Sequence, residues 1–170
     1  MKKIFTQIAE AFGCLFLAGC DTVFDVHPYD VHVDGDKNVN AANIAKIESA
    51  IKYKDTIRFA MISDTHQWLD DLKKEVNDIN RRKDRIDFVL HCGDVTDFGA
   101  TQEFQWTRDR LQKLKMPFVV LLGNHDCLGT GNQTYEVVFG KPDFSFIAGR
   151  VKFVCLNTNA IELRLFPSCT

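Results

Sequence analysis

The sequence predicts an α/β domain with a mostly parallel sheet flanked by helices. Three short apolar runs, at 57–62, 86–90 and 117–122, recur at intervals of about thirty residues, close to the length of one strand–helix–strand unit. Amphipathic stretches separate these runs. Continuous apolar strands between amphipathic helices indicate a parallel sheet that is covered on both faces.

The first twenty residues differ from the rest and are predicted to form a signal peptide. A basic start at 1–3 precedes a short apolar stretch at 11–18, and Leu17-Ala18-Gly19-Cys20 resembles the lipobox of bacterial lipoproteins. We therefore expect lipidation of Cys20 to anchor the chain to a membrane of the bacterial cell envelope. An amphipathic N-terminal helix packed on the domain is the alternative, because Glu10 interrupts the apolar character.

Residues 21–56 are predicted to hold a tether, a short strand and a helix. The segment 21–33 is polar with scattered valines and leads into an edge strand. Apolar residues at helical spacing predict a helix over 40–51, with Asn40 as its N-cap.

From residue 57 to residue 170 the pattern is that of one domain. We expect strands at 58–62, 87–91 and 117–122 and helices at 68–82 and 101–114. A weak helix at 135–139 and a hairpin of strands at 144–147 and 151–156 follow.

Three polar motifs follow the three apolar runs in order: Asp64-Thr65-His66, Gly93-Asp94 and Gly123-Asn124-His125-Asp126. Each alone is weak, since Asp64 and Asp94 would also suit helix N-caps. In an open α/β sheet, however, ligands bind beyond the carboxyl ends of the strands. Carboxylate, imidazole and amide groups together at that edge suit a pair of divalent metal ions.

The motif order resembles the calcineurin-like metallophosphoesterase family, whose signature runs D-x-H, G-D-x-x, G-N-H-[D/E], a lone His, then G-H-x-H. The resemblance implies the first half of a four-layer αββα sandwich. It also implies a phosphoesterase that hydrolyses a small phosphomonoester or phosphodiester through a metal-bridging hydroxide.

By that resemblance, four residues are expected to bind two divalent metal ions. Asp64 and His66 resemble ligands of the first metal, Asp94 the carboxylate that bridges both metals, and Asn124 a ligand of the second. Imidazole and oxygen ligands fit manganese, iron or zinc, and the sequence does not choose between them.

Two further residues resemble catalytic groups of the family. His125 resembles the histidine that faces the scissile phosphate, and Asp97 the acidic residue that orients that histidine. Phe98 follows Asp97 where the Ser/Thr protein phosphatase branch has an arginine, and Asp97 stands where purple acid phosphatases have a tyrosine. A phosphodiesterase-like or small-substrate phosphatase branch is therefore favoured.

The C-terminal part of the family pattern is missing, because no histidine follows His125. We expect the C-terminal half of the domain to be absent, either through truncation of a longer gene or because a second chain completes the fold. A half-liganded site predicts weak or no activity. The alternative is a non-catalytic envelope lipoprotein that keeps half of the fold as a binding module.

Composition excludes several other classes. The 21 basic and 23 acidic residues nearly balance without a basic patch, which argues against nucleic acid as a standing partner. The sequence contains no C-x-x-C pair, so neither a zinc knuckle nor a redox site is indicated. It also contains no G-x-G-x-x-G motif, so a dinucleotide site is not indicated. His91 ends a buried strand and is expected to pack there or to support the ligands from behind. Oligomeric state is not predicted.

Overall fold

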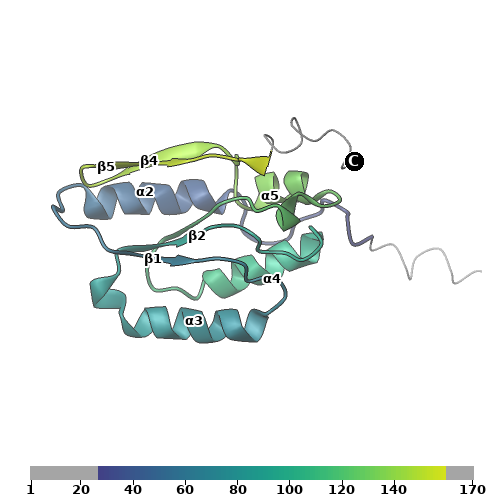
Figure 1. Cartoon of the computed structure of the whole chain (residues 1–170), viewed down its shortest axis with the longest axis horizontal. Helices are drawn as coiled ribbons and strands as arrows, with labels where there is room; N and C mark the ends of the chain where they lie inside the picture. The colour runs from purple at the N-terminus through teal and green to yellow at the C-terminus, as the bar shows by residue number, and fades with distance from the viewer. Residues whose placement is uncertain (1–26, 160–170) are drawn as a thin grey trace, which may run out of the picture.

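The structure is a computed structural model that describes residues 27–159 (Figure 1). The expected signal peptide, its lipobox and Cys20 lie outside these residues. Among residues 27–159, no helix has both the length and the apolar character needed to cross a bilayer.

The predicted α/β architecture is confirmed. The helices are α2 (Val39–Ile51), α3 (Leu69–Arg81), α4 (Thr101–Leu111) and α5 (Gly131–Val138), with short 3-10 helices η1 (Lys83–Arg85) and η2 (His125–Cys127). The strands are β1 (Phe59–Ile62), β2 (Phe88–His91), β3 (Phe118–Val120), β4 (Phe144–Ala148) and β5 (Val151–Cys155). Strands β1, β2 and β3 form a parallel sheet in that order, and β4 and β5 form an antiparallel hairpin.

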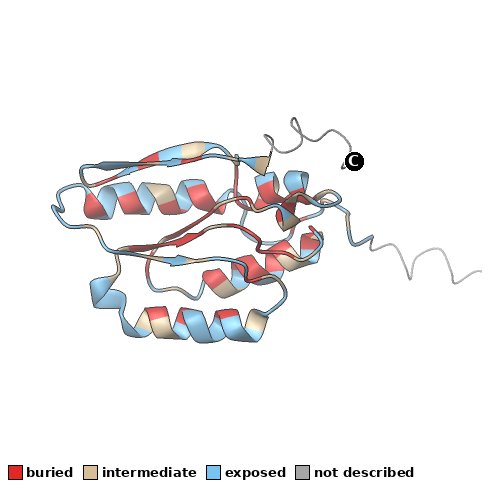
Figure 2. Cartoon of the chain, in the orientation of Figure 1, coloured by how far each residue is buried: buried red, intermediate tan, exposed pale blue. Residues whose placement is uncertain are grey.

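Both faces of the parallel sheet are covered. Alternate residues of β2 and β3 point to opposite sides, so each strand contributes side chains to two cores. Val89 and Val120 belong to a core that includes buried side chains of α3 and α4. Phe88 and Val119 belong to a second core with α2 and the β4–β5 hairpin, where the Phe88 and Phe146 rings lie 5.7 Å apart. The buried stripes of the helices face the sheet (Figure 2). Each large side chain buried in these cores contributes about 1.5–3 kcal/mol.

The expected edge strand in 21–33 is wrong over the residues that the structure describes, because 27–33 form no strand. This arm lies against the start of α4, which satisfies its carbonyl groups in place of a strand partner. The Thr101 N–H donates to the Pro28 carbonyl at 3.1 Å, and the Thr101 hydroxyl donates to the Asp30 carbonyl. Just after the arm, the Asp34 N–H donates to Gln105 Oε1 at 2.8 Å. Polar groups on a neighbouring helix leave no periodic signal in the arm itself.

The expected N-cap at Asn40 is also wrong. Helix α2 begins at Val39 after Asn38, which has a left-handed φ of 51°. Asn40 is buried in the first turn, where its Nδ2 donates to the carbonyl of Val120 at 2.8 Å and its Oδ1 accepts from the Val120 N–H at 2.9 Å. The amide therefore hydrogen bonds to the outer side of β3 as a neighbouring strand would.

Two helix boundaries differ from the expected ones by more than one residue. Helix α4 ends at Leu111, three residues early, and α5 begins at Gly131 instead of Tyr135. Backbones approach closely where α5 begins, since a Cβ at Gly131 would lie 2.1 Å from the Asp126 carbonyl oxygen and 3.0 Å from the Gly99 Cα. The polar residues of its first turn hid this start from the apolar periodicity.

Candidate metal centre

The three polar motifs lie in the loops that leave the carboxyl ends of β1, β2 and β3, as the strand order predicts. The first two loops are joined by main-chain hydrogen bonds. The Asp64 N–H donates to the Gly93 carbonyl at 3.1 Å, and the His66 N–H donates to the Asp94 carbonyl at 3.1 Å. The side chains of the two loops are thereby held in a fixed relative position.

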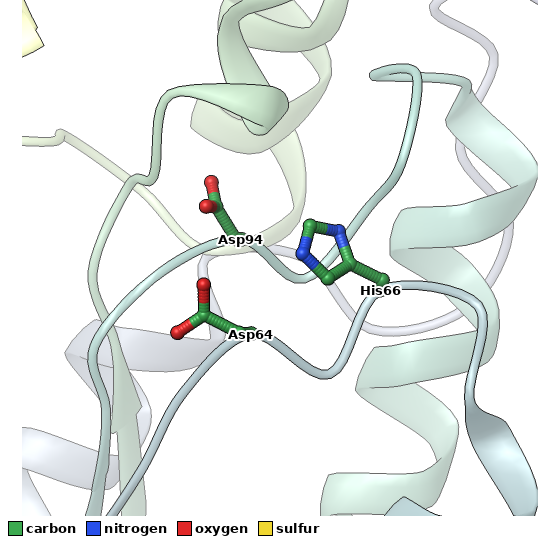
Figure 3. Close-up of side chains that lie close together, drawn as sticks. All are labelled: Asp64, His66 and Asp94. Atoms are coloured by element: carbon green, nitrogen blue, oxygen red, sulfur yellow. The ribbon is translucent and has the colours of Figure 1, made fainter.

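Asp64, His66 and Asp94 converge at this edge (Figure 3). Each offers one ligand atom, and these atoms all lie within 4.8 Å of one another. Asp64 is exposed, His66 is half-buried and Asp94 is buried. Two carboxylates and an imidazole whose ligand atoms gather at one point are a donor set that suits a divalent transition metal.

The backbone at these three residues is strained. Their φ angles are 56° at Asp64, 45° at His66 and 55° at Asp94, in the left-handed region. This region is unfavourable for residues other than glycine, and such strain gathers where a ligand is bound. Regular backbone angles at these positions would direct the side chains elsewhere.

The third loop, which follows β3, packs against Asp94. Gly123 has no room for a side chain, because a Cβ there would lie 2.1 Å from both the N and the Oδ1 of Asp94. The His125 N–H donates to Asp94 Oδ1 at 2.9 Å. Asn124 is exposed between these two residues. The structure thus places the fourth expected ligand at the same edge, and its binding to a second metal stays a prediction.

The hydrogen bonds of His66 determine which ring nitrogen is available to a metal. Its Nδ1 lies 2.9 Å from the Thr96 carbonyl and 3.0 Å from Asp97 Oδ1. Because a carbonyl can only accept, Nδ1 carries the proton and Nε2 keeps its lone pair. A carbonyl or carboxylate behind a ligating histidine fixes its tautomer and orientation in this way.

His125 lies beside His66, with the two ring centroids 4.8 Å apart and the planes nearly perpendicular. Its Nδ1 is 2.9 Å from the main-chain carbonyl of Asp97. This hydrogen bond to the Asp97 carbonyl raises the pKa of His125, to which the nearby Asp94 carboxylate also contributes. Asp97 thus contacts both imidazoles. Its carboxylate contacts the His66 ring, and its main-chain carbonyl accepts a hydrogen bond from the His125 ring.

Asp126 is a residue of the third motif for which no role is predicted from the sequence. It is fully buried and accepts hydrogen bonds from the Gly123 N–H at 2.9 Å, the Thr96 N–H at 2.9 Å and the Thr96 hydroxyl at 3.0 Å. Burial raises the pKa of its carboxyl group, although these hydrogen bonds oppose the shift. The carboxylate therefore ties the loop after β3 to the loop after β2.

His91 is fully buried at the end of β2, as expected of a supporting residue. Its Nε2 is 2.9 Å from Thr65 Oγ1, and its Nδ1 accepts from the Gly93 N–H at 3.3 Å. Burial lowers the pKa of His91 to about 4, so the ring is neutral near pH 7.

The cysteines beside the motifs are ordinary packed thiols. Cys127 donates its S–H to the Gly123 carbonyl at 3.3 Å, and burial raises the pKa of this thiol to about 11. A protonated thiol is a poor metal ligand. Among the described residues, the acidic, cysteine and histidine side chains arranged to hold a metal ion are those of Asp64, His66 and Asp94.

Comparisons with known proteins agree with this geometry. A family model described as calcineurin-like phosphoesterase matches residues 57–165, which include all three motifs. A curated relative, "Probable glycerophosphodiester phosphodiesterase GpdQ" of Arcobacter nitrofigilis, is 40% identical over 48 residues. This match covers 28% of the chain and 18% of the relative, so the chain spans less than a fifth of that protein's length in the alignment.

Proposed function

Because the chain belongs to the calcineurin-like phosphoesterase family, we propose that it is a metal-dependent phosphoesterase that acts on a small phosphate ester. The observation that carries the proposal is the convergence of Asp64, His66 and Asp94 within 4.8 Å at the carboxyl edge of the sheet. That edge is where open α/β sheets bind their ligands.

The residues of the site fit two divalent ions of manganese, iron or zinc. Asp64 and His66 would hold the first ion, Asp94 would be shared, and Asn124 would hold the second. When bound, such a pair lowers the pKa of water to yield a nucleophile near pH 7 and draws charge from the phosphoryl oxygens. The buried Asp94 suits the shared position, because both neighbouring loops contact it.

His125 is suited to protonate the leaving oxygen of the ester. Its Nδ1–H is taken up by the Asp97 carbonyl, so the proton that it can donate is the one on Nε2. The raised pKa keeps a larger fraction of the ring protonated near neutral pH. An imidazole with a pKa near the working pH is an efficient general acid. Asp97 then acts as a positioning residue, through its carbonyl for His125 and its carboxylate for His66.

We propose a phosphodiester of a small alcohol as the preferred substrate. The exposed Phe98 follows Asp97 where an arginine would favour a doubly charged phosphomonoester. The curated relative is named as a phosphodiesterase, which supports the same choice.

Attachment to the cell envelope through lipidated Cys20 is a separate proposal that rests on the sequence 17–20. Lipidation would be seen as incorporation of labelled palmitate that is lost in the Cys20→Ala variant. Equal labelling of both chains would contradict it.

The enzymatic proposal is tested on the whole chain loaded with Mn²⁺. Metal content and turnover of bis(p-nitrophenyl) phosphate and p-nitrophenyl phosphate are measured beside the Asp64→Asn variant. Because the half-liganded site predicts low activity, we expect weak metal-dependent hydrolysis that this variant loses, with the diester preferred. Metal retention without hydrolysis of either ester would favour the non-catalytic binding module, and hydrolysis that persists in Asp64→Asn would contradict the site.

A further inference from the structure

His91 is a buried polar residue that takes no direct part in the proposed reaction. It ends β2, the central strand of the parallel sheet, and none of its surface is exposed. Because an unpaired polar group is costly in such a place, the two hydrogen bonds of its ring define its position.

These bonds reach both loops that carry the converging side chains. The Gly93 N–H can only donate, so Nδ1 of His91 accepts at 3.3 Å and the proton of the neutral ring is on Nε2. Nε2–H then donates to Thr65 Oγ1 at 2.9 Å. Thr65 lies between Asp64 and His66, and Gly93 directly precedes Asp94.

The two loops need such support. Asp64, His66 and Asp94 have left-handed φ angles, which cost free energy that the surroundings must offset. Their carboxylates also repel each other in the absence of a cation. Main-chain hydrogen bonds join the loops directly, and Asp126 ties only the second loop to the third. Within residues 27–159, His91 is the one side chain outside the first two loops that hydrogen bonds to both.

We propose that His91 is a positioning residue whose imidazole holds Asp64, His66 and Asp94 together before a metal binds. The affinity for the first divalent ion then depends on an imidazole that does not touch the ion. This inference rests on the metal site of the proposed function, but it does not depend on turnover.

The test is the affinity of the purified whole chain for Mn²⁺, measured by titration calorimetry at pH 7.5. His91→Phe keeps a ring and removes both hydrogen bonds, whereas Thr65→Val removes one bond and keeps the side-chain shape. We expect each variant to weaken Mn²⁺ binding by about 10- to 100-fold, the usual effect of losing a partner behind the ligands. The double variant should bind nearly as His91→Phe does, because the two residues share one bond.

Two further variants separate positioning from general stability. His91→Gln offers an amide donor toward Thr65 and should restore most of the affinity. Thr134→Val is the matched control, since Thr134 is a fully buried threonine whose hydroxyl lies 3.1 Å from that of Thr101, away from the two loops. It should lower the midpoint of thermal unfolding and leave Mn²⁺ affinity unchanged.

The outcomes separate the two proposals. If His91→Phe is folded by circular dichroism and binds Mn²⁺ as the natural chain does, the role of His91 is refuted; if it does not fold, unchanged binding by Thr65→Val refutes it equally. A natural chain that binds Mn²⁺ but hydrolyses neither ester contradicts only the phosphoesterase proposal. A natural chain that fails to bind Mn²⁺ overturns both.

Discussion

The two ends of the parallel sheet are built differently, although they belong to the same three strands. At the amino ends, polar side chains lie on the surface: Lys54 pairs with Asp87, and Asn80 bonds to the main chain of Lys115 at 2.7 Å. No non-glycine residue of the turns 52–58, 82–87 and 112–117 has a positive φ. At the carboxyl ends, polar groups such as His91 and Asp126 are buried and three residues are left-handed. Between the loops at the two ends, left-handed non-glycine residues and buried polar side chains thus occur at the end where a ligand is expected.

The largest effect should follow from His125→Ala at the carboxyl end. With an alkyl phosphodiester, whose alcohol leaves poorly without a proton, we expect turnover to fall by roughly 10²- to 10⁴-fold. With bis(p-nitrophenyl) phosphate the loss should be much smaller, because p-nitrophenolate leaves unprotonated. Mn²⁺ affinity is the control and should not change. Equal losses with both esters would rule out proton donation by His125.

Adding a side chain at Gly123 should have the next largest effect. In Gly123→Ala the new Cβ would lie 2.1 Å from Asp94 Oδ1, so Asp94 must move and we expect Mn²⁺ affinity to fall by about 100-fold or more. Gly129→Ala is the matched control on the same rim. Its Cβ would meet the Tyr29 ring and not Asp94, so it should cost stability alone. Equal Mn²⁺ affinity in the two variants would contradict the close packing on Asp94.

Acid should destabilise the carboxyl end through His91. Its pKa is 6.5 in the unfolded chain and about 4 in the fold, so between these values only the unfolded chain binds the proton. The stability contributed by the neutral ring is therefore complete above pH 6.5 and is lost as the pH falls toward 4, on the order of a few kcal/mol in total. Urea unfolding of the metal-free chain from pH 7.5 to 4.5 measures this slope. His91→Gln should flatten it, while the opposite effect of Asp126 stays the same in both chains.

The smallest effect should come from the amino end. Lys54→Ala removes an exposed ion pair with Asp87, and such pairs contribute about 0–1 kcal/mol. Thermal unfolding should shift by a few degrees at most, and Mn²⁺ affinity should be unchanged. A change in affinity would show that the two ends are coupled, and the comparison would fail.

The sequence predicts the fold well wherever one side chain and its neighbours decide the structure. The stripe of Leu72, Val76 and Ile79 marks α3, and the apolar run at 117–122 marks β3. Prediction from the sequence fails where a residue that is distant along the chain determines the local structure. The arm 27–33 hydrogen bonds to Thr101 of α4, and Asn40 hydrogen bonds to β3 eighty residues away. Neither partner can be inferred from local periodicity.

The site shows the same division. Asp64, His66 and Asp94 could be chosen in advance, because strand order brings the motifs to one edge. The sequence could not show that the Asp97 carboxylate would contact His66 and not His125. That choice depends on whether the loop turns the carboxylate or the main-chain carbonyl of Asp97 toward each ring. The burial of Asp126 and the two bonds of His91 depend in the same way on loops that approach each other in space.

Asn40 has a consequence for how the protein behaves at high concentration. In the described part of the chain, β3 is an outer strand of the parallel sheet, and the Asn40 amide occupies both polar groups of Val120 on its free side. An uncovered strand rim can template the pairing of one molecule with the next. Here the rim is buried, and the Tyr135 hydroxyl also donates to the Val120 carbonyl at 2.6 Å, so the Val120 N–H is the group that depends on Asn40 alone. We therefore expect Asn40→Ala to make concentrated samples turbid only when warming opens α2 away from β3, and a variant that turns turbid in the cold would contradict this interpretation.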